Sequence, residues 1–238
     1  MLEVESLTTR YGSIAAVREA SLAVQVGEVV CLIGPNGAGK TTLLASVAGL
    51  LRPAAGRVVF DGVEVTGWSP DRMLRAGLAL VPEHRRIFAD LSVRENLLVG
   101  GVTQRPARRI ELLDEVVDLF PVLAGKLPVP AGYLTGGEAQ PLAIGRSLRG
   151  DPRLLLMDEP ALGLAPVLVD VVFDLIGSLR DAGRTLLVVE QNAQRMLEVA
   201  DRAYVMRSGQ IVTEGSANEL ADRDDLFDTY LGRAGTPA

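Results

Sequence analysis

Short runs of apolar and β-branched residues recur along the chain. Glycine, proline or charged residues bound each run, which predicts buried β-strands. The predicted strands cover residues 22–26, 29–33, 57–60, 78–81, 154–157, 185–189 and 203–206. Residues 58–65 also favour a β-hairpin, because Asp61 and Gly62 in its middle suit a tight turn.

Other stretches repeat apolar residues every three or four positions, which predicts amphipathic helices. They cover residues 41–51, 109–120 and 166–180. In the second stretch, Ile110, Leu113, Val117 and Phe120 would share one buried face. The third stretch starts with Pro166, a residue suited to the first helical position. Strands that alternate with helices predict an α/β fold with a largely parallel sheet.

Residues 83–150 depart from this alternation because they contain no strong strand signal and hold arginine-rich and proline-rich segments. They predict a helical lobe inserted between strands of the core. The first 65 residues instead favour strands, which predicts a small antiparallel region at the edge of the core. We therefore expect a single domain over residues 1–238, in which residues 1–82 and 151–238 form the core.

The chain has 238 residues, 48% hydrophobic and 23% charged, as in ordinary globular proteins. Its formal net charge of −6 disfavours a general nucleic-acid binder, because such binding needs a basic surface. Charge-free stretches reach only eleven residues, well short of the ~20 that a membrane-spanning helix needs. The acidic N-terminal segment does not resemble a signal peptide, so we expect the chain to stay in the cytoplasm. Cys31, the single cysteine, lies in an apolar run and predicts an inert buried thiol.

A glycine-rich segment, GPNGAGKT, lies between the predicted strand 29–33 and the predicted helix 41–51. It fits the phosphate-loop pattern G-x-x-x-x-G-K-[ST], and this strand–loop–helix context supports the motif. The backbone N–H groups of such a loop and the N-terminus of its helix bind phosphate oxygens. We expect the nucleotide to be bound by Gly34, Pro35, Asn36, Gly37, Ala38, Gly39, Lys40, Thr41 and Thr42.

Two side chains of this loop have distinct predicted tasks. The Lys40 ammonium would neutralise the β and γ phosphates and so contribute to catalysis. The Thr41 hydroxyl is a hard oxygen ligand of the kind that Mg²⁺ prefers. The motif therefore predicts that the chain binds ATP together with Mg²⁺.

Two carboxylates, Asp158 and Glu159, follow the buried strand 154–157. The strand would deliver both to its carboxyl end, where open α/β sheets bind ligands. Asp158 is placed to hold Mg²⁺, and Glu159 to polarise a water as the general base. An acidic helix cap after an apolar strand is an equally ordinary pattern, but the upstream phosphate loop favours the catalytic interpretation.

A second glycine pair occurs in the segment LTGGE, residues 134–138, just before a helical pattern over 142–148. Thr135 can cap this helix, and Glu138 three residues later completes a capping box. The same segment also fits a second anion site, because Gly136 and Gly137 open a helix N-terminus. Within one chain that site would be unused if the phosphate loop held a whole nucleotide.

Taken together, these segments resemble the ATP-binding subunits of ABC transporters over nearly the whole chain. Besides the phosphate loop and Asp158-Glu159, the resemblance rests on Tyr11, residues 81–83, residues 134–138 and Gln191. Within the family the chain is most similar to ATPases of branched-chain amino-acid importers. The segments that carry this likeness are residues 81–88, 142–148, 158–166 and 189–192.

The resemblance implies a phosphate-loop, RecA-like core and a head-to-tail dimer. In that dimer, ATP lies between the phosphate loop of one cassette and Thr135, Gly136, Gly137 and Glu138 of the other. Tyr11 would stack on adenine. Glu83 stands where most relatives have glutamine and would ligate Mg²⁺ or hold a water. Gln191 replaces a common histidine and would contact the γ-phosphate.

The function implied is ATP hydrolysis that drives an importer of branched-chain, hydrophobic amino acids. Its partners would be two membrane-spanning permease subunits, a second cassette and, indirectly, an extracytoplasmic solute-binding protein, at the cytoplasmic face of the bacterial inner membrane. Residues 84–86 would help to dock the permeases. Two alternatives stay open: an importer of urea or short amides, and a soluble phosphate-loop phosphotransferase.

Two further residues differ from the general family pattern. Ala165 stands where most relatives have aspartate, as in the branched-chain amino-acid group. Pro141 would lie beyond the first turn of the helix that Thr135 caps, where proline lacks a needed N–H group. We expect Pro141 to strain this helix.

Overall fold

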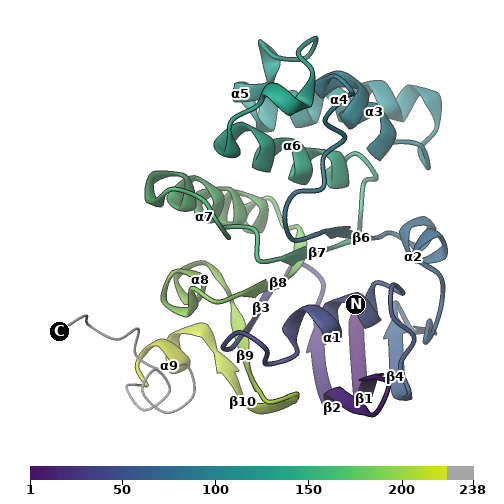
Figure 1. Ribbon diagram of the computed structural model, residues 1–238, viewed down its shortest axis with the longest axis vertical. Helices are drawn as coiled ribbons and strands as arrows, with labels where there is room; N and C mark the ends of the chain where they lie inside the picture. Colours follow the sequence, from purple (N-terminus) through teal and green to yellow (C-terminus); the bar gives the residue numbers. More distant parts are fainter. Residues whose placement is uncertain (224–238) are drawn as a thin grey trace.

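The computed structural model describes residues 1–223 (Figure 1). Its strands are β1 Leu2–Tyr11, β2 Ile14–Val24, β3 Val29–Ile33, β4 Ala55–Phe60, β5 Val63–Glu64, β6 Leu78–Val81, β7 Leu154–Asp158, β8 Thr185–Glu190, β9 Arg202–Arg207 and β10 Gln210–Ser216. Its helices are α1 Lys40–Val47, α2 Pro70–Ala76, α3 Val93–Gly100, α4 Pro106–Leu119, α5 Pro121–Ala124, the 3₁₀ turn η1 Ala131–Tyr133, α6 Gly136–Leu148, α7 Pro166–Asp181, α8 Ala193–Val199 and α9 Ala217–Ala221. These elements confirm the predicted α/β class.

A six-stranded sheet in the order β10-β9-β3-β8-β7-β6 forms the centre of the molecule. Its five strands from β9 to β6 run parallel, and β10 pairs antiparallel with β9 at one edge. Every residue of β3, β7 and β8 is buried, because both faces of this sheet are covered. The prediction of a largely parallel sheet is therefore confirmed.

The two faces of the central sheet belong to separate cores. Val29, Cys31 and Ile33 pack among the helices α6, α7 and α8, whereas Val30 and Leu32 pack with α1 and the N-terminal strands. This alternation follows from the two-residue repeat of a strand. Cys31 is fully buried, as predicted, and burial raises the pKa of its thiol.

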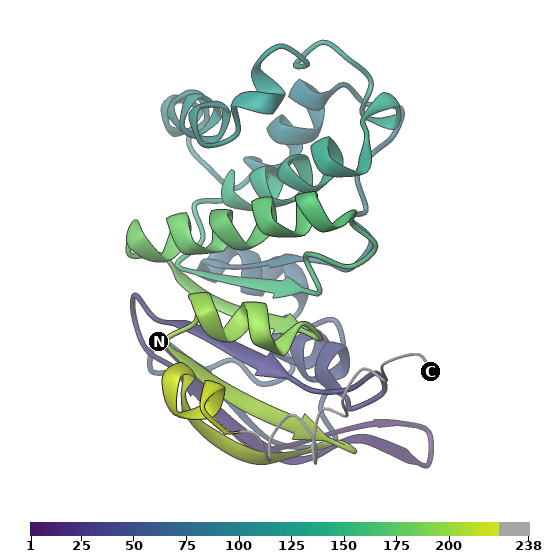
Figure 2. The same ribbon diagram turned by 90° about the vertical axis from the view of Figure 1, so that its left-hand side faces the viewer.

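The N-terminal strands form a second, four-stranded antiparallel sheet in the order β2-β1-β4-β5. It is larger than the predicted edge region, and the predicted strand 22–26 is only the end of β2. Strand β1 escaped prediction because polar residues alternate with its buried ones and bulges interrupt its pairing with β2. Figure 2 shows this sheet below the central sheet and the helical region above it.

Helices α3 to α6 occupy the chain between β6 and β7. The buried face of α4 consists of Leu112, Leu113 and Val116, whereas Ile110 is 67% exposed. Spacing alone placed Ile110 in the core. It lies outside because α4 is buried only along the face that contains Leu112, Leu113 and Val116. The spacing of apolar residues did not separate this face from the one that contains Ile110.

Helix α1 ends at Val47, four residues before the predicted end. Gly49 follows with φ 78°, a left-handed conformation, and a Cβ there would lie 2.3 Å from the Trp68 carbonyl oxygen. The close approach of two backbones therefore stops the helix. Among residues 1–223, none of the helices combines the length and apolar character needed to cross a bilayer.

Candidate nucleotide-binding site

The glycine-rich loop connects the carboxyl end of β3 to the first turn of α1. Gly37 and Gly39 have φ values of 76° and 105°, which favour glycine. A Cβ at Gly34 would lie 2.2 Å from the Met206 carbonyl oxygen, so that position has no room for another residue. No side chain caps α1, which leaves the first N–H groups of the helix available to an anion.

Lys40 lies at the floor of this loop and is only 4% exposed. Its Nζ donates hydrogen bonds to the carbonyl oxygens of Gly34 at 2.8 Å and Pro35 at 3.3 Å. The same atom lies 3.3 Å from Oε1 of Glu159, which is also buried. The ammonium therefore has an anionic partner here, and a phosphate entering the loop would compete with Glu159 for it.

Thr41 and Asp158 meet beside the loop. The Thr41 hydroxyl donates to Oδ1 of Asp158 at 3.0 Å. Burial raises the pKa of Asp158 to about 6. The Thr41 hydrogen bond opposes this rise, whereas the carboxylates of Glu83 and Glu159 add to it. The site thus concentrates oxygen ligands and negative charge where a cation would be stabilised.

Glu159 leaves β7 with a φ of 45°, a conformation that few non-glycine residues adopt. Its N–H donates to the Val189 carbonyl oxygen at 2.9 Å, which ties it to the end of β8. Gln191 directly follows β8, and its Nε2 donates to Oε2 of Glu159 at 2.7 Å. Glu159 and Gln191 are 32 positions apart in the chain but adjacent because β7 and β8 are parallel neighbours.

Lys40, Thr41, Glu159 and Gln191 line a cleft of about 450 Å³. Its walls are formed by Ala16, Asn36, Gly37, Ala38, Gly39, Lys40, Thr41, Thr42, Glu83, Glu159, Leu162 and Gln191. Tyr11 is half exposed at the end of β1, with its hydroxyl 3.5 Å from the Thr42 hydroxyl. Residues from five separate segments therefore converge on one volume.

The second glycine pair is not among the residues that line this cleft. Thr135, Gly136, Gly137 and Glu138 form the start of α6, where the predicted capping box is present. Oε2 of Glu138 accepts from the Thr135 N–H at 3.0 Å, and Lys126 pairs with Oε1. The Lys126 ammonium, together with the Thr135 hydrogen bond, lowers the pKa of Glu138. Helix α6 continues through Pro141 to Leu148.

Sequence reasoning missed three residues of the site: Ala16, Leu162 and Glu190. Ala16 reaches the cleft only through the β1–β2 hairpin, and Leu162 through the loop after Glu159, so neither carried a local signal. Glu190 did have a local signal in the sequence, because it ends the apolar strand β8 in the same way that Asp158 ends β7. It is buried, and its carboxylate accepts from three backbone N–H groups.

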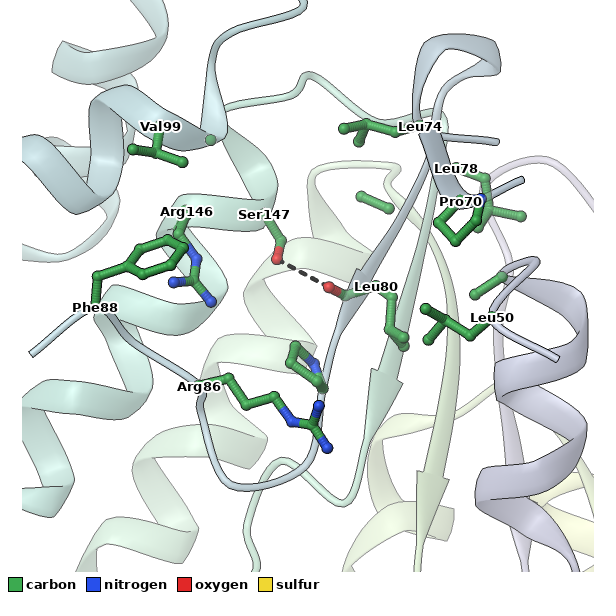
Figure 3. Close-up of a pocket in the computed structure, with 14 residues that line it drawn as sticks. Leu50, Pro70, Leu74, Leu78, Leu80, Arg86, Phe88, Val99, Arg146 and Ser147 are labelled. Atoms are coloured by element: carbon green, nitrogen blue, oxygen red, sulfur yellow. Dashed lines mark hydrogen bonds between the residues drawn. The ribbon is translucent and has the colours of Figure 1, made fainter. Parts of the chain in front are cut away.

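A second hollow, of about 410 Å³, opens between α1, α2, β6 and the helices α3 and α6 (Figure 3). Its wall is mostly apolar and includes Leu50, Leu80, Phe88 and Val99. Arg146 also lines it, and the buried Nη1 of this side chain has no hydrogen-bond partner among the described residues. We call this hollow the lobe–core groove.

Comparison with known proteins supports one family. The domain model described as "ABC transporter" matches residues 17–162. The chain is 43% identical over 233 residues to the high-affinity branched-chain amino acid transport ATP-binding protein BraG of Pseudomonas aeruginosa, covering 98% of this chain and 100% of that protein. It is 36% identical over 233 residues to a protein of Archaeoglobus fulgidus named "Probable branched-chain amino acid transport ATP-binding protein LivF", covering 98% of this chain and 99% of that one.

A solved structure agrees with these sequence relatives. The ADP conformation of an ATP-binding cassette of an ABC transporter superimposes with a TM-score of 0.84 at 28% identity, covering 96% of this chain and 97% of that chain. The match to the domain model spans more than half of the chain, and the relatives span nearly all of it. The chain therefore belongs to the ATP-binding proteins of ABC transporters.

Proposed function

We propose that the chain is the ATP-hydrolysing subunit of an ABC importer for branched-chain, hydrophobic amino acids. The arrangement of Lys40, Glu159 and Gln191 at one edge of the central sheet carries the hydrolytic part of this proposal. The importer and its cargo follow from the full-length relatives, two of which are named for branched-chain amino-acid transport.

ATP would bind with its phosphates in the loop of residues 34–39 and against the N-terminus of α1. Lys40 would exchange Glu159 for the β and γ phosphates, because a triphosphate offers more anionic oxygens than one carboxylate. Tyr11 is exposed and close to Thr42, so its ring is available to stack on adenine.

Mg²⁺ fits the residues beside the loop. Among residues 1–223, no group of three or more histidine, cysteine or acidic side chains forms a metal cage, which suits an ion held by one or two carboxylates together with substrate phosphates. Thr41 and Asp158 would hold it, with Glu83 as a further oxygen ligand. When bound, the ion would neutralise phosphate charge that the ammonium of Lys40 alone leaves uncompensated.

Glu159 is the proposed general base. Once a phosphate draws Lys40 away, one oxygen of Glu159 is free to accept a proton from a water that attacks the γ-phosphate. The Gln191 amide holds the other oxygen at 2.7 Å and so orients the carboxylate. Its amide cannot take up a proton itself, which leaves the proton with Glu159.

The helix start at Thr135 to Glu138 would complete the nucleotide site of a second cassette. It is a capped, glycine-rich N-terminus of a 13-residue helix, and its residues do not line the cleft of their own chain. We propose a head-to-tail pair of cassettes, formed by two copies of this chain or by this chain and a sister protein.

The lobe–core groove would receive the permease subunits. We propose that residues 83–150 act as one lobe against a core of residues 1–82 and 151–238, with the groove between them. Its apolar wall and the unpaired Nη1 of Arg146 suit a segment that is mostly apolar and carries a carboxylate. We propose that the chain works at the cytoplasmic face of the membrane, with a solute-binding protein acting on the permeases from the other side.

The hydrolytic role is tested by Glu159→Gln. Removing the base should lower the ATPase rate about 100-fold or more, while ATP binding is retained or becomes tighter, because Lys40 no longer pairs with a Glu159 carboxylate. Glu5→Gln is a control, since Glu5 is an exposed carboxylate paired with Arg57 far from the cleft. Parental turnover in Glu159→Gln would refute the assignment.

The cargo is tested in vesicles that contain this chain together with permease subunits and a solute-binding protein of a branched-chain amino-acid importer. ATP-dependent uptake of labelled leucine that Glu159→Gln abolishes is the expected result, and uptake of urea without leucine would support the amide importer instead. A soluble phosphotransferase would pass the γ-phosphate to an acceptor rather than to water, so free phosphate equal to ADP in amount argues against it.

A further inference from the structure

Glu190 is a buried carboxylate with no assigned role in phosphate binding or proton transfer. It ends β8 and is only 3% exposed. Its Oε1 accepts a hydrogen bond from the Ala161 N–H at 3.0 Å. Its Oε2 accepts from the N–H groups of Gln191 at 3.0 Å and Asn192 at 3.3 Å. Among residues 1–223, each oxygen of this carboxylate thus accepts at least one hydrogen bond from a backbone N–H group.

These donors come from the two segments that carry the catalytic pair. Ala161 lies two residues after Glu159, and Gln191 provides the amide that meets the Glu159 carboxylate at 2.7 Å. The two segments leave the sheet beside each other, because Asp158 of β7 is in register with Val189 of β8. One carboxylate therefore bridges the backbones on both sides of the Glu159–Gln191 contact.

Only an ionised carboxylate serves both segments. Burial raises the pKa of Glu190, the Glu159 carboxylate adds to this rise, and the three backbone hydrogen bonds offset it only in part. A glutamine of the same shape has one acceptor oxygen, and its NH₂ group would face a backbone N–H donor. Burying a charge in this place is costly, so the bonds that offset the cost also hold both turns in one conformation.

We propose that Glu190 is a positioning residue for ATP hydrolysis, which holds the backbones of Gln191 and of the segment after Glu159 so that amide and carboxylate meet. The inference rests on the proposed function of the cleft. It assigns Glu190 no contact with nucleotide, so its effect must pass through the Glu159–Gln191 contact.

The test compares kcat and ATP affinity of the full chain with those of Glu190→Gln. Misplacing a catalytic group by a fraction of an ångström is costly, so we expect kcat to fall about tenfold or more, with the Kd for ATP within about twofold of the parent. Thr185→Val is the matched control. Thr185 is buried at the other end of β8 and accepts from the Gly27 N–H at 2.9 Å, so its loss removes a similar bond away from the cleft.

A second comparison separates positioning from general destabilisation. In a Gln191→Ala background the contact is already absent, so Glu190→Gln should reduce kcat by less than about twofold further. Parental kcat in Glu190→Gln overturns the proposal, as does an equal loss in both backgrounds, because destabilisation of the fold acts in both. A parent chain that does not hydrolyse ATP refutes the proposed function itself, and the positioning role with it.

Discussion

Asp158 is buried beside Thr41, and its pKa of about 6 compares with 3.8 for an unperturbed aspartate. A raised pKa means that the folded protein favours the protonated form, so ionisation of Asp158 destabilises the fold as pH rises through about 6. In the absence of a cation, the ionised Asp158 carboxylate therefore lowers the free energy of unfolding. Below the unperturbed pKa the cost vanishes, because the carboxyl is protonated in both states.

Asp158→Asn should consequently stabilise the nucleotide-free chain at neutral pH. We expect its free energy of unfolding at pH 7, measured with urea in the presence of EDTA, to exceed that of the parent by up to about 3 kcal/mol. The difference should shrink towards zero near pH 4, while ATPase activity is lost at every pH. A stability difference that is the same at both pH values would contradict the burial argument.

At the scale of elements, α6 combines a strong start with a weak interior. Thr135 and Glu138 cap it, but Pro141 is the sixth helical residue and offers no N–H to the Gly137 carbonyl. The helix is held by tertiary packing instead, since Leu142, Ala143 and Ile144 are fully buried.

Pro141→Met should relieve this strain. The free energy of unfolding is expected to rise by about 1–2 kcal/mol, less than the full cost of an interior proline because proline also restricts the unfolded chain. The ATPase rate should rise with it if strain limits the helix start. Pro106→Met is the control, because Pro106 occupies the first turn of α4, where proline is compatible. An unchanged or lower stability of Pro141→Met would remove the strain argument.

How far the sequence predicts elements depends on their burial. The strands β3, β7 and β8 are covered on both faces, so their unbroken apolar runs revealed them almost to the residue. Strand β1 and most of β2 did not stand out, because exposed residues interrupt them and their pairing contains bulges. The end of α1 depends on the approach of Trp68 to Gly49, a contact between distant segments.

The same distinction holds for the site. Lys40, Thr41, Asp158 and Glu159 belong to local patterns in which neighbouring residues carry the signal. Ala16 reaches the cleft through a hairpin. The bridging role of Glu190 depends on the register of β7 and β8, which no local pattern encodes.

At the scale of the whole molecule, the lobe–core groove places two basic side chains, Arg86 and Arg146, against an apolar wall. Leu50→Glu should prevent a permease segment from docking, because it puts a charge on that wall. Val63→Glu is a matched control, since Leu50 and Val63 are 55% and 52% exposed but Val63 lies on β5, away from the groove. Co-purification with the permeases is expected to be lost in the first variant only. Equal recovery of both would argue against docking in the groove.

The molecule also has two glycine-rich helix starts that do not line one cleft within the chain: α1 begins at the cleft, and α6 begins outside it. We propose that they are the two halves of a nucleotide site shared between two cassettes. Gly136 allows a clean test, because a Cβ there would meet Arg85 at an ordinary 3.5 Å and aspartate is favourable in the first turn of a helix. Gly136→Asp should therefore fold, yet repel the γ-phosphate bound by a second cassette.

The most direct measurement is the ATPase rate of Gly136→Asp, recorded alongside ATP binding and ATP-dependent association by light scattering. We predict ATP binding within about twofold of the parent, loss of association and an ATPase rate about 100-fold lower. Gly125→Asp is the control, since a Cβ at Gly125 meets nothing within 4 Å, and it should behave as the parent. A monomeric Gly136→Asp chain that hydrolyses ATP at the parental rate would contradict the account.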